Sequence, residues 1–216
     1  MNDPLVLLGL HTTLFELLAF VLSVTTVALN IRQNHWAWLF AIVSSAAYCV
    51  VFFNSRLYGD AGLQLVFIVV SVWGWYSWLH GASAISSNTT AATTNSRERR
   101  MLAVSTLDAR GWLLAGVGWA LGYLVLSWFL RTYTNTDVPH TDAFLTAGSL
   151  VGQVLLSRKK LENWHAWIIV DVLYVGLYVY KGLLLTGVLY ALFVAMAVAG
   201  LVAWRRTLPA AGSAAP

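Results

Sequence analysis

The hydrophobic stretch 164–180 contains a single carboxylate, Asp171, flanked by aromatic residues at helical spacing. Two tryptophans precede it and two tyrosines follow, at steps of three, four, three and four residues, so all five share one face of a helix. An ionised carboxylate against lipid costs about 3 kcal/mol even on the lenient insertion scale, so Asp171 should face the bundle interior or water. The face consists of Trp164, Trp167, Asp171, Tyr174 and Tyr178.

Rings around a negative charge suit a flat, cationic ligand through stacking, cation–π attraction and charge pairing. A different interpretation stays open, in which Asp171 bonds to a neighbouring helix and the rings belong to the core or to an interfacial belt. We favour the ligand site because four rings flank the acid.

Other stretches offer residues that could complete such a site. Gln64 is the best additional group for hydrogen bonds to ligand hydroxyls or an amide, and Phe67 shares its face. Tyr190 is the matching aromatic residue near the C-terminal end of the chain. Asp60 lies at the outer rim, and we favour a solvated or helix-capping role for it over a ligand contact. Glu16 lies near the outer end of its stretch, where a snorkelling or capping carboxylate is at least as plausible as a ligand contact.

The composition indicates that these stretches are membrane helices. Of 216 residues, 59% are hydrophobic and only 10% are charged, whereas an ordinary soluble domain is about 25% charged. A bilayer core requires about 20 mostly apolar residues per helix. We therefore expect an all-α polytopic membrane protein with seven transmembrane helices, the fifth being the shortest. The expected spans are 14–31, 36–53, 60–79, 112–131, 142–157, 164–180 and 185–204.

The basic residues predict the orientation in the membrane. Ten of the 13 Lys and Arg residues fall on the side of the C-terminus and three on the side of the N-terminus. By the positive-inside rule, the N-terminus lies outside and the C-terminus lies in the cytoplasm. The net charge of +4 then reflects a cytoplasmic collar, and no nucleic-acid partner is expected.

The sequence also contains an internal repeat. Shifting it by 126 positions aligns it with itself without gaps. The matched pairs include Trp38 with Trp164, Tyr48 with Tyr174, Gly74 with Gly200, and Trp78 with Trp204. Trp78 and Trp204 also lie near span ends, where tryptophan by default belongs to the interfacial belt.

Each repeat would contain three spans, with one span between them that restores the direction of the second repeat. The predicted fold is 3+1+3, with two parallel repeats, a recurring transporter design, although duplication also produces channels, receptors and scaffolds. The expected parts are the first repeat 14–79, a polar cytoplasmic linker 80–111, a connecting helix 112–131 and the second repeat 142–204.

The repeat makes the expected pocket asymmetric. The positions that match Trp167 and Asp171 in the first repeat are Ala41 and Ser45. One wall would be bulky and charged and the other small, as expected for an asymmetric ligand rather than an ion.

Other chemistries find little support in the sequence. The five His residues are scattered without the spacing of a metal site. There is no glycine-rich phosphate loop and no arrangement of a nucleophile with a base. We expect no cofactor, no metal and no catalytic residues, although a membrane enzyme or a seven-helix receptor remains an alternative of a different class.

Several motifs together resemble the PnuC-type nicotinamide riboside transporters, over residues 16 to 206 apart from the linker and much of the fourth span. The motifs are Arg56-Leu57-Tyr58-Gly59-Asp60, Leu63-Gln64, Trp73-Gly74-Trp75-Tyr76-Ser77-Trp78 and Lys159-Lys160-Leu161-Glu162-Asn163-Trp164-His165-Ala166-Trp167. The resemblance implies a SWEET-like but larger fold, a multi-pass protein of the bacterial inner membrane, a homotrimer, and a role in NAD biosynthesis. It also implies facilitated diffusion of nicotinamide riboside, trapped inside by a cytoplasmic kinase.

The resemblance further implies ligand contacts on the second and third helices of each repeat. Some family members carry Asn where this chain has Ser44 and Asp171. Because relatives carry thiamin or riboflavin, thiamin is the alternative substrate, and the neutral, bulkier riboflavin fits Asp171 less well. The implied contacts are Ser44, Tyr48, Gln64, Phe67, Trp164, Trp167, Asp171 and Tyr174.

Overall fold

The computed structural model describes residues 5–7, 10–12, 14–54, 58–80, 102–134, 136–180, 182 and 184–208. These residues form seven helices, which confirms the predicted all-helical fold, preceded by a two-stranded antiparallel hairpin of β1 (Leu5–Leu7) and β2 (Leu10–Thr12). The helices are α1 (Leu14–Ile31), α2 (Trp36–Asn54), α3 (Tyr58–His80), α4 (Ala109–Tyr133), α5 (Pro139–Ser157), α6 (Asn163–Tyr180) and α7 (Leu184–Arg205).

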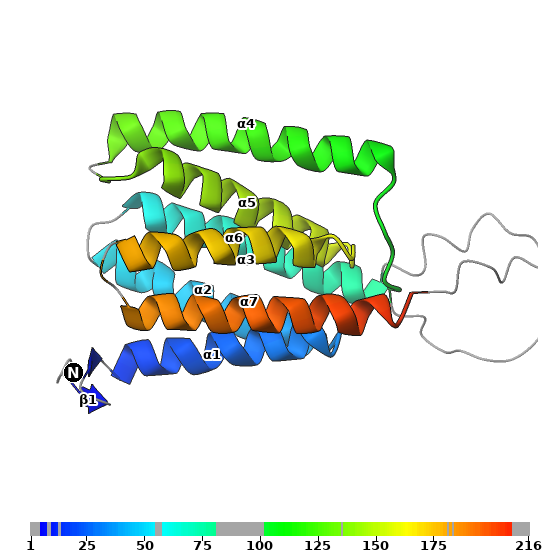
Figure 1. The fold of residues 1–216 in the computed structure, drawn as a ribbon, viewed down its shortest axis with the longest axis horizontal. Coiled ribbons are helices and arrows are strands. Elements are labelled where there is room, and N and C mark those ends of the chain that lie inside the picture. The colour runs from blue at the N-terminus through cyan, green and yellow to red at the C-terminus, as the bar shows by residue number, and fades with distance from the viewer. Residues whose placement is uncertain are drawn as a thin grey trace, which may run out of the picture.

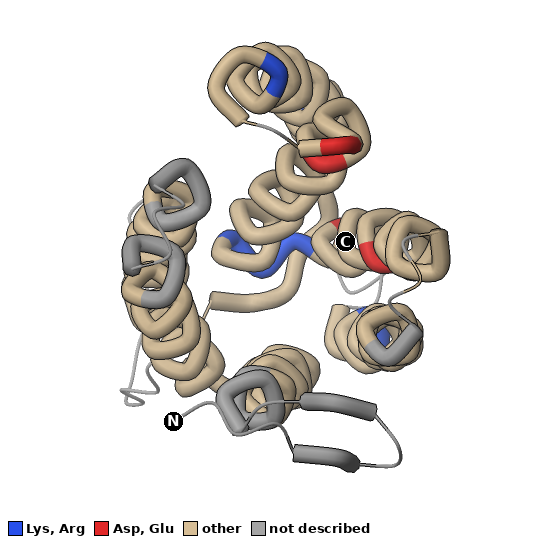
Figure 2. The backbone as a smooth tube through the Cα atoms, turned by 90° about the vertical axis from the view of Figure 1, so that its left-hand side faces the viewer, with Lys and Arg blue, Asp and Glu red and all other residues tan. Residues whose placement is uncertain are grey.

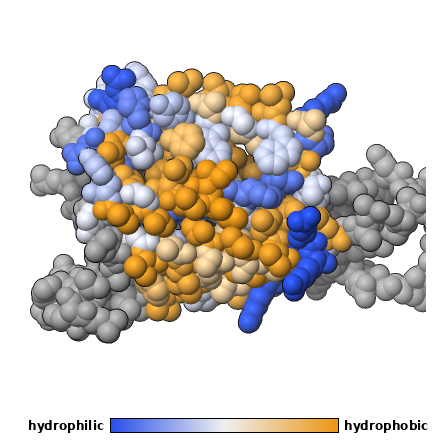
Figure 3. All heavy atoms as spheres, in the orientation of Figure 1, coloured by the Kyte–Doolittle hydropathy of each residue, from blue (hydrophilic) through white to orange (hydrophobic). Residues whose placement is uncertain are grey.

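The helices carry the apolar surface that a membrane protein needs. Figure 3 shows an apolar band across the middle of the molecule with hydrophilic residues toward both ends. Among the described residues, three helical segments are long and apolar enough to cross a membrane by length and composition. They are Gly62–His80, Ala109–Tyr133 and Thr186–Arg205.

Two helices begin three residues earlier than hydropathy predicts. α4 begins at Ala109 because the side chain of Asp108 caps it, accepting a 2.8 Å hydrogen bond from the backbone N–H of Gly111. α5 begins at Pro139 and has 19 residues, one more than α1 and α6. The prediction that the fifth span is the shortest was therefore wrong, because the polar first turn of α5 conceals its start from a hydropathy profile.

The helices form two three-helix units with α4 outside them (Figures 1 and 2). α1 packs on α2 and α2 on α3, while α5 packs on α6 and α6 on α7. The units meet through α1 with α7 and through α3 with α5, and α4 packs on α5. Since a shift of 126 residues converts α1, α2 and α3 into α5, α6 and α7, the two junctions between the units are equivalent. This is the predicted 3+1+3 architecture.

The interior of each unit depends on one tryptophan lying against one glycine. A Cβ atom placed on Gly74 would collide with the six-membered ring of Trp38, and one placed on Gly200 would collide with the ring of Trp164. Both tryptophans are at most 2% exposed. The matched Trp and Gly positions of the repeat are therefore packing partners, and glycine is required because the indole occupies the space of a side chain.

The connection into α4 is partly anchored. Ser105 forms a parallel bridge with Lys160, and the carboxylate of Glu162 accepts a 2.9 Å hydrogen bond from the backbone N–H of Leu107. These contacts hold the C-terminal part of the 80–111 segment against the turn between α5 and α6. Residues 81–101 lie outside the described part of the chain.

The glycine contact makes a prediction about stability. Gly74→Ala should lower the free energy of unfolding by about 1 to 3 kcal/mol, the usual cost of overfilling a packed core. Thermal unfolding of the purified protein in detergent measures this. Gly62→Ala on the same helix is the matched control, because nothing lies within 4 Å of the added methyl group. Equal stability of the two variants would contradict the packing argument.

Candidate functional site

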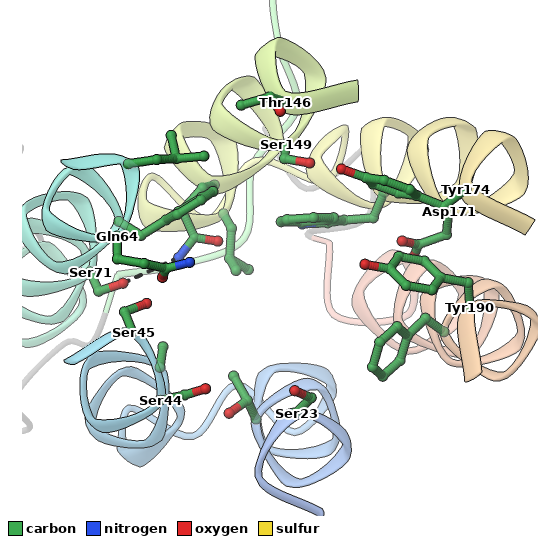
Figure 4. A pocket seen from close by; sticks show the side chains of 18 of the residues that line it. Ser23, Ser44, Ser45, Gln64, Ser71, Thr146, Ser149, Asp171, Tyr174 and Tyr190 are labelled. Atoms are coloured by element: carbon green, nitrogen blue, oxygen red, sulfur yellow. Dashed lines mark hydrogen bonds between the residues drawn. The ribbon is translucent and has the colours of Figure 1, made fainter. Parts of the chain in front are cut away.

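A cavity of about 1270 Å³ lies between the two three-helix units. Side chains from all seven helices line it, and Figure 4 shows polar groups from several of them converging on the same space. Its described lining runs from Asn30 and Leu156, at one end of the bundle, to Thr136 and Asp142 at the other.

Nine of the ten residues that the sequence analysis proposed as ligand contacts line this cavity. The exception is Tyr48, which is half-buried on α2 one turn beyond Ser44 and is not among the lining residues. The nine are Ser44, Gln64, Phe67, Trp164, Trp167, Asp171, Tyr174, Tyr178 and Tyr190.

Asp171 is 6% exposed and lies in the middle of α6. Its carboxyl group points into the cavity beside Tyr190, and the ring of Tyr174 lies on the same wall (Figure 4). Among the described residues, no Lys or Arg side chain lines the cavity. The carboxyl group therefore has no basic partner in the described lining, although a buried charge requires compensation.

Three tyrosine rings form a continuous wall next to this acid. The ring centroids of Tyr174 and Tyr190 are 4.7 Å apart, and those of Tyr178 and Tyr190 are 5.1 Å apart. Tyr174 and Tyr178 stack at 5.8 Å with 18° between their planes, and Phe193 lies edge-on to Tyr190 at 5.6 Å. Such a wall offers ring faces and hydroxyl groups to a flat ligand.

The opposite wall, on α2 and α3, is made of smaller polar groups. Figure 4 shows Ser44, Ser45 and Gln64 directed toward the cavity. In the repeat register Ser45 stands where the other unit has Asp171, and Gln64 stands where it has Tyr190. The two walls therefore differ in size and charge, although the backbone around them is repeated.

A polar stripe on α5 completes the cavity and was missed by the sequence analysis. The Nε2 group of Gln153 donates a 3.4 Å hydrogen bond to Oγ of Ser71 on α3, and Asp142 lies three turns away toward the other end of α5. The sequence spacing indicates this stripe, because its polar residues follow one another at steps of four, three and four and so share one helix face. They are Asp142, Thr146, Ser149 and Gln153.

Asp142 is the second acid of the cavity. It is half-buried, and one carboxyl oxygen accepts a 2.6 Å hydrogen bond from Oγ1 of Thr136. Among the described lining residues, Asp142 and Asp171 are the ones with a formal charge, and both are negative. The side chains of Glu16 and Asp60 lie outside the described residues. The electrostatic field inside the described cavity therefore favours a cation.

The described basic residues are concentrated at one end of the bundle. We name the end near Arg32 the basic end, because seven of the eight described Lys and Arg residues lie there and only Arg131 lies at the opposite end. The described acids outside the cavity are divided between the ends, with Asp108 and Glu162 at the basic end and Asp137 at the opposite end. The basic-end residues are Arg32, Arg110, Arg158, Lys159, Lys160, Arg205 and Arg206.

Three expectations about individual basic-end residues were wrong. Trp78 and Trp204 are 0% exposed rather than interfacial, and the indole N–H of each donates to a backbone carbonyl. Lys159 is 2% exposed rather than part of a solvated collar. Its ammonium group lies 4.5 Å from the ring centre of Trp78, and burial lowers the pKa of Lys159 to about 8.

No cluster of three metal-ligating side chains occurs among the described residues.

Comparison with known proteins identifies relatives over most of the chain. A family model described as nicotinamide mononucleotide transporter matches residues 13–206. The riboflavin/roseoflavin transporter RibM of Streptomyces davaonensis is 25% identical over 204 residues, which cover 94% of this chain and 90% of RibM. The nicotinamide riboside transporter PnuC of Escherichia coli is 22% identical over 199 residues, covering 82% and 79% of the two chains.

A solved structure has the same fold. The crystal structure of the vitamin B3 transporter PnuC superposes with a TM-score of 0.65 at 23% identity, covering 89% of this chain and 81% of that chain. The resemblance inferred from the motifs is thereby confirmed. Because the family model spans nearly all of the described helices, the chain belongs to the nicotinamide mononucleotide transporter family, the family of PnuC, and is a multi-pass membrane vitamin transporter rather than an enzyme.

Proposed function

We propose that this transporter carries a positively charged aromatic vitamin, nicotinamide riboside, by facilitated diffusion. The observation that carries the proposal is the position of Asp171, buried at 6% exposure beside three tyrosine rings in a cavity whose described lining holds no basic residue. A pyridinium ring satisfies both features at once, since it stacks on the rings and compensates the carboxylate. Ser44 and Gln64 on the opposite wall then face the ribose and carboxamide.

Two other vitamins compete with this choice. Thiamin is also an aromatic cation, and it would use the same acid and rings. Riboflavin is supported by the similarity to RibM and by a cavity of about 1270 Å³, but its neutral isoalloxazine ring leaves the charge of Asp171 without a partner. The cationic vitamins therefore rank above riboflavin on the chemistry of the cavity.

We also propose that the basic end faces the cytoplasm of a bacterial cell, with the N-terminus outside and the 80–111 linker inside. The concentration of Lys and Arg at the basic end supports this orientation. A cytoplasmic kinase that phosphorylates the vitamin would make uptake unidirectional, because the cavity field disfavours an anionic product. Assembly as a homotrimer would cover part of α4, where Leu113 and Leu114 are 67% and 71% exposed.

The first experiment compares the three vitamins on the purified protein. Nicotinamide riboside should bind in titration calorimetry, and thiamin and riboflavin should be tested as competitors at equal concentration. Asp171→Asn should weaken nicotinamide riboside binding about tenfold or more, since the amide removes the charge with little change of shape. Asp137→Asn, an exposed acid outside the lining, is the control. Unchanged affinity in the folded Asp171→Asn variant, or preferential binding of riboflavin, would reject this assignment.

Asp142 should contribute less than Asp171 to the affinity for the cationic vitamin, and its contribution should depend on the salt concentration. Because it is half-buried, its attraction for a cation is screened by salt far more than that of Asp171. We expect Asp142→Asn to lower the affinity about two- to fivefold at low ionic strength, with the difference vanishing at high salt. Calorimetric titrations at two salt concentrations measure this. A salt-independent loss would instead indicate direct contact with the bound vitamin.

Facilitated diffusion predicts the end point of transport. Proteoliposomes without kinase should take up labelled nicotinamide riboside until the internal and external concentrations are equal, and an imposed pH gradient should leave the initial rate unchanged. Co-reconstituting a nicotinamide riboside kinase with ATP should raise total internal label above that level. Accumulation of unmodified vitamin against its gradient, or dependence on the pH gradient, would contradict the proposed mechanism.

A further inference from the structure

The cavity ends at a cluster of four tryptophans at the basic end. Trp38 and Trp164 line the cavity and are 1% and 2% exposed. Beyond them lie Trp78 and Trp204, which are 0% exposed and do not line it. We name these four residues the tryptophan cluster; their rings lie between the cavity and the basic end.

The cluster follows the internal repeat. Trp38 meets Trp78 edge-on at 5.5 Å and 89°, and Trp164 meets Trp204 edge-on at 5.4 Å and 89°. The two pairs join where Trp78 and Trp204 lie 6.0 Å apart. The rings thus form a continuous chain that crosses from one three-helix unit to the other at its centre.

Two reciprocal hydrogen bonds fasten this chain across the junctions between the units. The indole N–H of Trp78, on α3, donates to the backbone oxygen of Leu156 on α5 at 3.0 Å. The indole N–H of Trp204, on α7, donates to the backbone oxygen of Asn30 on α1 at 3.1 Å. Leu156 and Asn30 are themselves 126 positions apart, so the two bonds are equivalent.

A third link lies directly over the cluster. Gln33 and Lys159, also 126 positions apart, adopt left-handed backbone angles with φ of 54° and 48°. The ammonium group of Lys159 lies over the ring of Trp78 at 4.5 Å and donates to the side-chain oxygen of Gln33 at 3.5 Å. A cation over an indole face is attracted by the ring quadrupole, so this residue joins the turn after α5 to α3 and to the turn after α1.

The closed arrangement also contains unsatisfied groups. The indole N–H groups of Trp38 and Trp164 are buried without a hydrogen-bond partner, and so is the side-chain oxygen of Asn30. Buried unpaired donors and acceptors raise the free energy of the state that contains them. The observed arrangement is therefore stabilised by the cross-unit bonds and destabilised by these unpaired groups.

We propose that the tryptophan cluster is the basic-end gate of the transport pathway, and that Trp78 and Trp204 are positioning residues that hold it shut through their bonds to the opposite unit. Opening separates α3 from α5 and α7 from α1 and breaks both indole–carbonyl bonds together. Trp38 and Trp164 then move apart with their own units, each still packed on its glycine. This inference rests on the transport function of the family and not on which vitamin is carried.

The test removes the two N–H groups while retaining an aromatic ring. In a Cys49→Ser background, a reporter cysteine at the cavity-lining Ser45 is labelled with a membrane-impermeant maleimide added to either face of membrane vesicles. Trp78→Phe and Trp204→Phe should each raise labelling from the basic-end face several-fold and lower it from the opposite face, and the double variant should do both more strongly. Trp112→Phe, at an exposed tryptophan of α4 near the same end, should label like the parent.

The direction of the change separates gating from damage. A loosened fold raises labelling from both faces, whereas a shifted gate raises it from one face and lowers it from the other. Lys159→Met provides a second route with both indoles intact, and it should shift labelling in the same direction. Labelling like the parent in all these variants, or an increase from both faces, would overturn the proposal. Because no vitamin is added, the result does not depend on the proposed substrate.

Discussion

The structure depends on two tryptophans that each occupy the side-chain space of a glycine. Trp38 lies on Gly74 and Trp164 lies on Gly200, and no other residue at either glycine position leaves room for the indole. These contacts bind α2 to α3 and α6 to α7 at one end of the bundle and bring the four rings of the tryptophan cluster together. In a membrane, where lipid is as apolar as the helices, close packing of this kind is a main source of helix association. The cavity is the space that remains where the same helices diverge.

On this repeated backbone the two units carry different side chains. The indole–carbonyl bonds of the gate follow the repeat, since Trp78 and Trp204 bond to the equivalent carbonyl groups of Leu156 and Asn30, although Trp204 also donates to Ile31. The side chains of the cavity walls do not, since Ser45 and Asp171 occupy equivalent positions on opposite walls. Because the bonds of Trp78 and Trp204 are equivalent, both junctions between the units can break in one movement. Because the two cavity walls differ, a ligand with unlike ends has a single preferred orientation. The two requirements fall on different residues of the same helices.

Helical spacing in the sequence was sufficient to find the acid and the rings of α6. An ionised side chain in a membrane helix faces the bundle interior or water, because its exposure to lipid is costly, and this fixes which face of α6 points inward. Spacing gives the direction of a side chain but not the extent of a cavity along the helix, and Tyr48, one turn past Ser44, shows the difference. Asp142 and Gln153 were missed because α5 starts with a polar turn and was judged by hydropathy alone. Lys159 could not have been predicted as buried, since its position depends on a left-handed turn and on the ring of Trp78 from the other unit.

The cross-unit bonds of Trp78 and Trp204, two residues that do not line the cavity, also suggest how one architecture serves different vitamins. RibM and PnuC are each 22 to 25% identical to this chain over at least four-fifths of its length, and their names state different cargoes. Under the proposed function, a change of cargo requires new side chains on the cavity walls, such as those at the positions of Asp171 and Gln64. Neither of these residues takes part in the indole–carbonyl bonds of Trp78 and Trp204. The free-energy difference between closed and open gates can therefore stay the same while binding changes. If transport is facilitated diffusion, as proposed, this independence matters, because a wall that bound its cargo tightly in one state alone would stop the transport cycle in that state.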